Sequence, residues 1–142
     1  MSVTLAPRLS LVGSVAGLIL LCTVPTAGAQ TRLTPKAFLD EVVGQRVEMR
    51  IVPSLRLVGV ETILSRSRTL WRRSNGSCTR GTISVRAAAI CFTYEDGPDI
   101  AHCWLPFEDA KGLYVVSTTT GEVQRIRSAT DDGPACTQDL TS

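Results

Sequence analysis

The residues of this sequence with the widest chemical repertoire are its cysteines and a single histidine. Cys78, Cys91, Cys103 and Cys136 follow residue 29, and His102 is the only histidine among the 142 residues. Near neutral pH a histidine can transfer protons, and a cysteine can act as a nucleophile, bind a metal or form a disulfide. The sequence contains no C-x-x-C pair, so the spacing does not indicate a zinc site or a thioredoxin-like centre.

A catalytic pair of His102 and Cys103 is the first chemistry to consider, because the two residues are adjacent. Adjacent residues of a strand point to opposite faces, so these side chains cannot make the contact that such a pair needs. The sequence also lacks a Gly-x-Ser-x-Gly elbow and a glycine-rich phosphate loop. We therefore predict that the protein is not an enzyme and uses no cofactor. The alternative is an enzyme in which His102 works with an acid of a nearby turn, Glu95, Asp96 or Asp99.

The first 29 residues have the three-part pattern of a secretory signal. One charge, Arg8, precedes an apolar run over residues 9–24, and the small residues 27–29 follow it. We predict cleavage after Ala29, export to the periplasm or the medium, and no stable membrane anchor after cleavage. A retained anchor is the alternative, because no charge interrupts residues 9–31.

Export places the four remaining cysteines in an oxidising environment, where an even number indicates two disulfides. Residues 95–99 are turn formers, and if they form the loop of a hairpin, Cys91 and Cys103 are equidistant from its centre. Opposed residues of paired strands lie about 4.5 to 5.5 Å apart, which a disulfide can span. This register leaves Cys78 to pair with Cys136. Two other pairings stay open on the sequence alone.

The pattern of apolar and polar residues predicts one helix followed by strands. Thr34 and Pro35 can begin a helix that ends at Gly44, and from Arg46 the apolar period changes from 3.6 to 2. The expected strands cover residues 46–51, 55–64, 68–73, 79–85, 89–94, 101–107, 113–118 and 122–128. We expect a mainly β fold: a single domain over residues 30–142, forming a small antiparallel barrel or sandwich of about eight strands after one short helix.

The hairpin register also assigns side chains to faces of the sheet. It places Phe92, Tyr94, His102 and Trp104 on one face, and apolar groups also occupy the other face. This fits either a strand pair buried on both sides or a barrel wall around an internal cavity. Such a cavity offers an apolar ligand a face made of Phe92, Tyr94 and Trp104. Pro106 requires a bulge or an unpaired edge position.

The two halves of the exported chain carry opposite charge. Residues 30–86 contain eleven basic and four acidic residues, whereas residues 87–142 contain three basic and nine acidic ones. The basic residues are almost all arginines, which suit forked contacts with carboxylates or phosphates. Five of them are candidates for an anion-binding surface: Arg66, Arg68, Arg72, Arg73 and Arg80. In the alternative interpretation, these arginines face the acidic residues of the second half.

Four short motifs follow one another between Cys78 and Trp104. Cys78 is followed by Gly81, then by Cys91-Phe92-Thr93-Tyr94 and by His102-Cys103-Trp104. The stretch from Gly59 to Trp104 resembles a loosely defined, uncharacterised group of short exported bacterial proteins. The resemblance implies a fold and an exported compartment. It implies no activity and assigns no catalytic or binding residue.

The composition limits the class of partner. A formal net charge of +2 argues against a nucleic-acid binder. The acids of residues 95–99 lack the spacing of a dedicated calcium loop, so we expect no metal. We predict a non-catalytic binding protein of the cell envelope, with an envelope protein or an acidic glycan as its partner. The alternatives are an inhibitor of a secreted hydrolase and a barrel that binds a small ligand.

Overall fold

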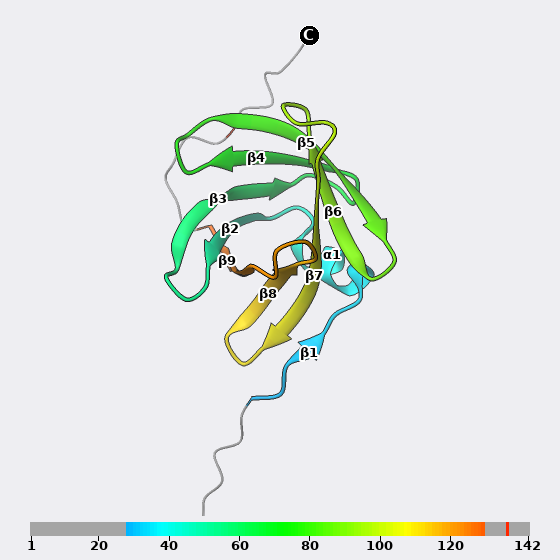
Figure 1. The fold of residues 1–142 in the computed structure, drawn as a ribbon, viewed down its shortest axis with the longest axis vertical. Coiled ribbons are helices and arrows are strands. Elements are labelled where there is room, and N and C mark those ends of the chain that lie inside the picture. The colour runs from blue at the N-terminus through cyan, green and yellow to red at the C-terminus, as the bar shows by residue number, and fades with distance from the viewer. Residues whose placement is uncertain (1–27, 130–135, 137–142) are drawn as a thin grey trace, which may run out of the picture.

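The computed structural model describes residues 28–129 and residue 136 (Figure 1). The predicted signal peptide, except for its last two residues, lies outside the described residues, so cleavage after Ala29 stays a prediction. In chain order the elements are β1 (Thr31–Arg32), α1 (Pro35–Val42), β2 (Arg46–Ile51), β3 (Arg56–Ile63), β4 (Arg68–Arg73), β5 (Cys78–Arg86), β6 (Ala89–Tyr94), β7 (Ala101–Asp109), β8 (Gly112–Ser117) and β9 (Val123–Ser128).

Strands β2 to β9 form a closed antiparallel barrel in which each strand pairs with its neighbours in the chain. The pairing of β9 with β2 closes it. The predicted mainly β fold of about eight strands after one helix is confirmed, as a barrel rather than a sandwich. The sequence did not predict β1, which lies outside the barrel and pairs with the last part of β7. At two residues, β1 is too short to show a period.

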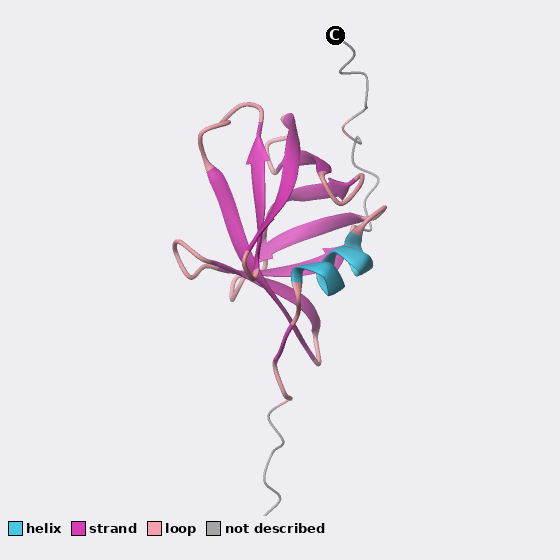
Figure 2. Ribbon diagram, turned by 90° about the vertical axis from the view of Figure 1, so that its right-hand side faces the viewer, coloured by secondary structure: helices cyan, strands magenta, loops and turns pink. Residues whose placement is uncertain are grey.

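Helix α1 begins and ends as its sequence predicts. The Thr34 hydroxyl oxygen accepts a hydrogen bond from the backbone nitrogen of Ala37 (3.1 Å), and Pro35 occupies the first turn. Gly44 follows the helix with a φ of 82°, a conformation that favours glycine. The buried face of the helix contributes Phe38, and with it Leu39 and Val42, to the core of the barrel. Figure 2 shows the helix beside the strands of the barrel.

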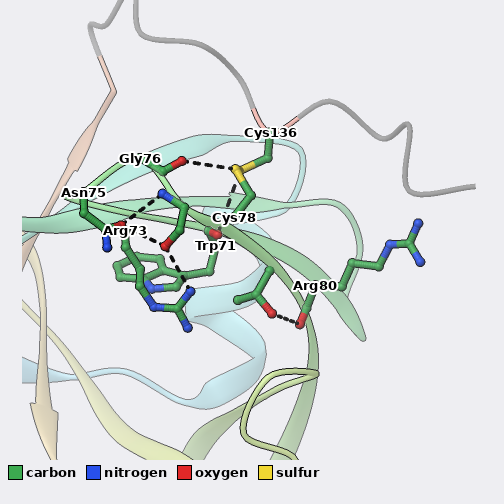
Figure 3. The surroundings of a disulfide bond; sticks show 9 residues. Trp71, Arg73, Asn75, Gly76, Cys78, Arg80 and Cys136 are labelled. Atoms are coloured by element: carbon green, nitrogen blue, oxygen red, sulfur yellow. Dashed lines mark hydrogen bonds between the residues drawn. A yellow bond between two sulfur atoms is a disulfide. The ribbon is translucent and has the colours of Figure 1, made fainter.

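Both predicted disulfides are present. Cys91 and Cys103 are register partners on β6 and β7, as the hairpin centred on residues 95–99 requires. Cys78 and Cys136 are bonded across 58 residues of sequence. Figure 3 shows Cys136 beside the start of β5, and its sulfur lies 3.8 Å from the carbonyl oxygen of Trp71. The second disulfide therefore ties a residue beyond β9 to the start of β5.

Pro106 lies at a position of β7 where the backbone nitrogen has no strand to donate a hydrogen bond to. Trp104 is the last residue of β7 that pairs with β6, and Phe107 is the first that pairs with β1. The carbonyl oxygen of Pro106 accepts a hydrogen bond from Leu33 (3.0 Å), on the same side of the strand as its own nitrogen. The Pro106 nitrogen, which has no proton, therefore lies beyond the part of β7 that pairs with β6, where no backbone donor is required.

The two disulfides are typical of an oxidising extracellular or periplasmic compartment. Within residues 28–129, no helix has the length and hydropathy needed to cross a membrane.

Candidate functional site

The interior of the barrel contains a cavity of about 600 Å³. Helix α1 covers one end, where Phe38 and Val42 line the cavity. At the opposite end, which we call the mouth, the lining residues Ile100, Thr119 and Thr120 are exposed. Apolar side chains form most of the wall, among them Val47, Met49, Ile63, Phe92, Trp104 and Ile126. The volume and the apolar wall match those of sites that hold small molecules.

The residues predicted to form an apolar ligand face lie together on this wall. Phe92 and Tyr94 of β6 and Trp104 of β7 all line the cavity, and so does His102. The register partners are Phe92 with His102 and Ile90 with Trp104, so the predicted assignment of side chains to faces holds. Binding of a ligand by these side chains stays a prediction.

Three neighbouring rings form what we call the aromatic arc: Trp71, Tyr94 and His102. The ring centres of Trp71 and Tyr94 lie 6.2 Å apart at an interplanar angle of 35°, and those of Tyr94 and His102 lie 5.9 Å apart at 47°. The rings come from β4, β6 and β7 and line one side of the cavity. Because the rings are tilted rather than stacked, their faces are only partly covered by each other.

Two glycines make room for the aromatic arc. A Cβ atom on Gly81 of β5 would lie 2.8 Å from both the Thr69 methyl group and the ring of Tyr94. A Cβ atom on Gly59 of β3 would lie 2.5 Å from the ring of Trp71. Gly59 also adjoins a β-bulge, because the register of β2 and β3 shifts between Met49 and its neighbour. The missing side chains of β3 and β5 therefore let the rings of β4 and β6 lie across the wall.

Glu61 is the buried acid of the site, and the sequence did not single it out. It lies on β3, is only 4% exposed and lines the cavity. Its carboxyl group accepts a hydrogen bond from the Tyr94 hydroxyl (2.9 Å) and contacts the Thr69 hydroxyl. Burial raises the pKa of Glu61 from 4.5 to about 8, although both hydrogen bonds oppose this shift. Burial and the neighbouring Glu61 raise the pKa of Tyr94, so its phenol remains a donor.

A signal for Glu61 does exist in the sequence. Glu61 has the same strand parity as Gly59 and Ile63, so it faces the interior whenever Ile63 does. Both faces of this strand carry apolar residues, however, and parity alone does not tell which face is internal. The choice depends on closure of the barrel, which the local pattern does not contain.

Arg73 and Asp96 form an ion pair at the mouth. Arg73 lines the cavity, and its Nη2 lies 2.5 Å from a carboxylate oxygen of Asp96. Asp96 also accepts a hydrogen bond from Thr79 (3.1 Å). Partial desolvation opposes the ionised form of Asp96, but the hydrogen bonds from Arg73 and Thr79 outweigh it and lower the pKa of Asp96. Arg73 therefore contributes a neutralised charge to the site.

The five arginines predicted to form one anion-binding surface occupy three different places. Arg68, Arg72 and Arg80 lie on the outer face of β4 and β5, where Arg80 is the register partner of Leu70 and Arg72 that of Cys78. Arg73 faces the cavity, and Figure 3 shows it extending away from Arg80. Arg66 lies in the turn between β3 and β4, where strand parity does not apply, and pairs with Asp40 of α1. Binding of anions by the outer-face arginines stays a prediction.

Among the described residues, the ion pairs show which acids of the second half meet arginines of the first half. Asp96 pairs with Arg73, but Asp109 pairs with Arg125, which belongs to the second half itself (2.8 Å). Among the described residues, the pair of Arg73 and Asp96 fits the alternative interpretation of the opposite charges.

The part of the chain that the structure describes contains no group of three or more histidine, cysteine or acidic side chains able to hold a metal. Cys103 is bonded to Cys91 and lies on the opposite face from His102, so these two residues do not form a catalytic pair. Comparisons with protein-family models, with curated proteins and with solved structures found no match for this chain.

Proposed function

We propose that this protein is a non-catalytic binding barrel that holds a small, largely apolar molecule inside its wall. The cavity of about 600 Å³ carries this proposal, because it is open at one end and lined mainly by aliphatic and aromatic side chains. Sites for small molecules typically combine such a wall with a few polar groups that orient the ligand. Here those groups are Glu61 and Tyr94 inside the cavity and Gln124 on β9.

The place of action that we propose is the periplasm or the medium. Two disulfides support an oxidising compartment. The signal-like residues 1–29 and the resemblance of residues 59–104 to exported bacterial proteins support export. A protein of this kind acts by carrying or sequestering its ligand in the cell envelope.

A fluorescence titration with N-phenyl-1-naphthylamine tests the proposal. This neutral, apolar probe emits strongly when it leaves water, so a saturable increase is expected with the exported form of the protein. Val115→Phe places a larger side chain in the cavity wall and should weaken binding by about tenfold or more. Val85→Phe is the matched control, because Val85 is 53% exposed and does not line the cavity.

A second variant guards against misfolding of the first. Met49→Trp enlarges a half-buried lining residue, which tolerates added volume better than Val115, only 2% exposed. Far-ultraviolet circular dichroism establishes that each variant is folded. Loss of probe binding in both lining variants and its retention in Val85→Phe support the proposal. Absence of saturable binding to the parent protein contradicts it, as does equal binding to all the folded variants.

A further inference from the structure

Among the described residues, Glu61 has no charged hydrogen-bond partner. Thr69 and Tyr94, which make its hydrogen bonds, are both neutral. Three charged or titratable groups near the mouth also line the cavity: Arg73, His102 and Glu122. Arg73 is engaged by Asp96, and Glu122 accepts a hydrogen bond from Gln124. A carboxyl group this deeply buried is costly as an ion unless a cation accompanies it.

The hydrogen-bond geometry of Thr69 indicates how the protein avoids that cost. The Thr69 hydroxyl oxygen lies 3.0 Å from the carbonyl oxygen of Thr62 and also contacts a carboxyl oxygen of Glu61. One hydroxyl has one proton, so it cannot donate to both oxygens. A proton on Glu61 resolves the conflict: Glu61 donates to Thr69, Thr69 donates to Thr62, and Tyr94 donates to the other oxygen of Glu61. The raised pKa of Glu61, about 8, agrees with this arrangement.

In this arrangement the available protons are already used within the wall. The proton of Glu61 serves Thr69, and the phenol proton of Tyr94 serves Glu61. The carboxyl oxygens of Glu61 can still accept hydrogen bonds from a ligand, and they carry a full negative charge if the proton leaves. A ligand group that donates hydrogen bonds therefore fits this position, and a positively charged donor gains most in a site of low dielectric.

The surroundings of Glu61 also favour a cation. The faces of the aromatic arc, Trp71, Tyr94 and His102, line the same cavity, and aromatic faces attract organic cations. Of the charged residues that line the cavity near the mouth, Arg73 is paired with Asp96, and Glu122 is an acid that accepts a hydrogen bond from the neutral Gln124. A carboxylate at this position attracts cations and repels anions.

We infer that the barrel binds a small organic cation, whose ammonium group pairs with Glu61 while its apolar part packs against Trp71 and Tyr94. This inference rests on the proposed function and names its ligand class. When the cation binds, Glu61 releases its proton to solvent, and the carboxylate and the ammonium group form the ion pair.

Isothermal titration calorimetry with three indoles of similar shape tests the inference. Tryptamine is a cation at pH 7, tryptophol is neutral and indole-3-acetate is an anion. We expect tryptamine to bind at least about tenfold more tightly than tryptophol, and indole-3-acetate to bind most weakly. Repeating the titration in buffers of different ionisation enthalpy should reveal the release of about one proton with tryptamine and none with tryptophol.

Glu61→Gln supplies the critical comparison. Glutamine retains a donor for Thr69 and an acceptor for Tyr94, so the variant is expected to fold and to bind tryptophol as the parent does. It should lose both the preference for tryptamine and the proton release. Glu108→Gln removes the same charge from an exposed position in the last part of β7, away from the cavity, and should retain both.

The outcomes separate this inference from the proposed function. Equal binding of tryptamine and tryptophol overturns the inference and leaves the binding barrel in place. The inference is also overturned if tryptamine fails to bind a protein that takes up N-phenyl-1-naphthylamine, or if Glu61→Gln keeps the cation preference. If neither the three indoles nor the apolar probe binds, the proposed function fails with it.

Discussion

Glu61 has an ionisable side chain and yet lies buried in an apolar wall. Burial favours its neutral form, which can donate to Thr69 and accept from Tyr94, whereas hydrogen bonds donated by both residues favour the carboxylate. The same residue can stabilise a bound cation once its proton leaves. The polar centre of the site thus lies on β3, and not on the turn acids or on His102.

The stability of the protein should depend on the ionisation of Glu61. Below the ordinary pKa of 4.5, Glu61 is protonated in both the folded and the unfolded chain. As the pH rises towards about 8, the unfolded chain ionises first, so stability is lost across this interval and levels off above it. Glu61→Gln should match the parent at the acidic end and exceed it by a few kcal/mol, on the order of the shift itself, near pH 8.

Urea denaturation across this pH range measures the effect, with Glu95→Gln as a control for a generic loss of charge. Parallel curves for the parent and Glu61→Gln would show that Glu61 is ionised in both states, against the protonated form described above.

Replacement of His102 distinguishes binding from catalysis. His102 is exposed at the mouth, touches the ring of Tyr94 and makes no pair with Cys103. We predict that His102→Ala changes the affinity for N-phenyl-1-naphthylamine by no more than about threefold, since the deeper wall is unaltered. A folded variant that loses binding altogether would place His102 at the centre of the function.

In the barrel wall, strands that carry a glycine (β3 and β5) alternate with strands that carry a large aromatic ring (β4 and β6). Gly59 of β3 lies under the ring of Trp71, and Gly81 of β5 lies beside that of Tyr94. Strand glycines are usually unfavourable because they pack little and lose entropy on folding. Here they are required, because the rings of the neighbouring strands occupy their space.

Gly81→Ala should therefore disturb the site as well as the fold. The new methyl group collides with Thr69 and Tyr94, the two partners of Glu61. We expect a loss of about 1 to 3 kcal/mol in the free energy of unfolding and a weaker near-ultraviolet signal from the displaced ring. Gly97→Ala is the matched control, because nothing lies within 4 Å of its added Cβ atom. If the two variants behaved alike, the close packing at Gly81 would be refuted.

The local elements were largely predictable from the sequence. A period of 2 and well-marked turns located all eight barrel strands to within two residues, and Thr34, Pro35 and Gly44 located the helix. The hairpin loop at residues 95–99 fixed the register of β6 and β7 and with it the first disulfide. These features depend on residues close together in the chain.

The non-local features were not predictable. Closure by β9 and β2 depends on residues some 80 positions apart, so the internal face of β3, and hence Glu61, could not be identified. Arg66 was a candidate for the same anion-binding surface as Arg68 and Arg72, but it lies in a turn and pairs with Asp40 of α1. Barrel closure and packing of the helix decided both positions.

For the whole molecule, the two disulfides constrain loops of very different length. The bond from Cys78 to Cys136 spans 58 residues, whereas that from Cys91 to Cys103 spans 12. A longer loop loses more conformational entropy in the unfolded chain when it is closed. The long bond also ties the chain beyond β9 to β5, so the barrel is fixed covalently as well as by its ladder.

Removal of the long disulfide should therefore cost more stability than removal of the short one. On the chain-entropy estimate, Cys78→Ser with Cys136→Ser lowers the free energy of unfolding by about 4 kcal/mol, and Cys91→Ala with Cys103→Ala by about 3 kcal/mol. Guanidinium denaturation of the two double variants measures the difference. The reverse order would show that packing around the fully buried Cys91, and not loop length, determines the cost.

Small molecules are expected to enter the barrel interior, and nuclear magnetic resonance locates them most directly. Titration of the labelled protein with N-phenyl-1-naphthylamine should shift signals of cavity-lining groups, above all the indoles of Trp71 and Trp104 and the methyl groups of Val115. Signals from the outer face, such as those of Arg68 and Thr82, should remain in place. Shifts confined to the outer face would contradict an internal binding site.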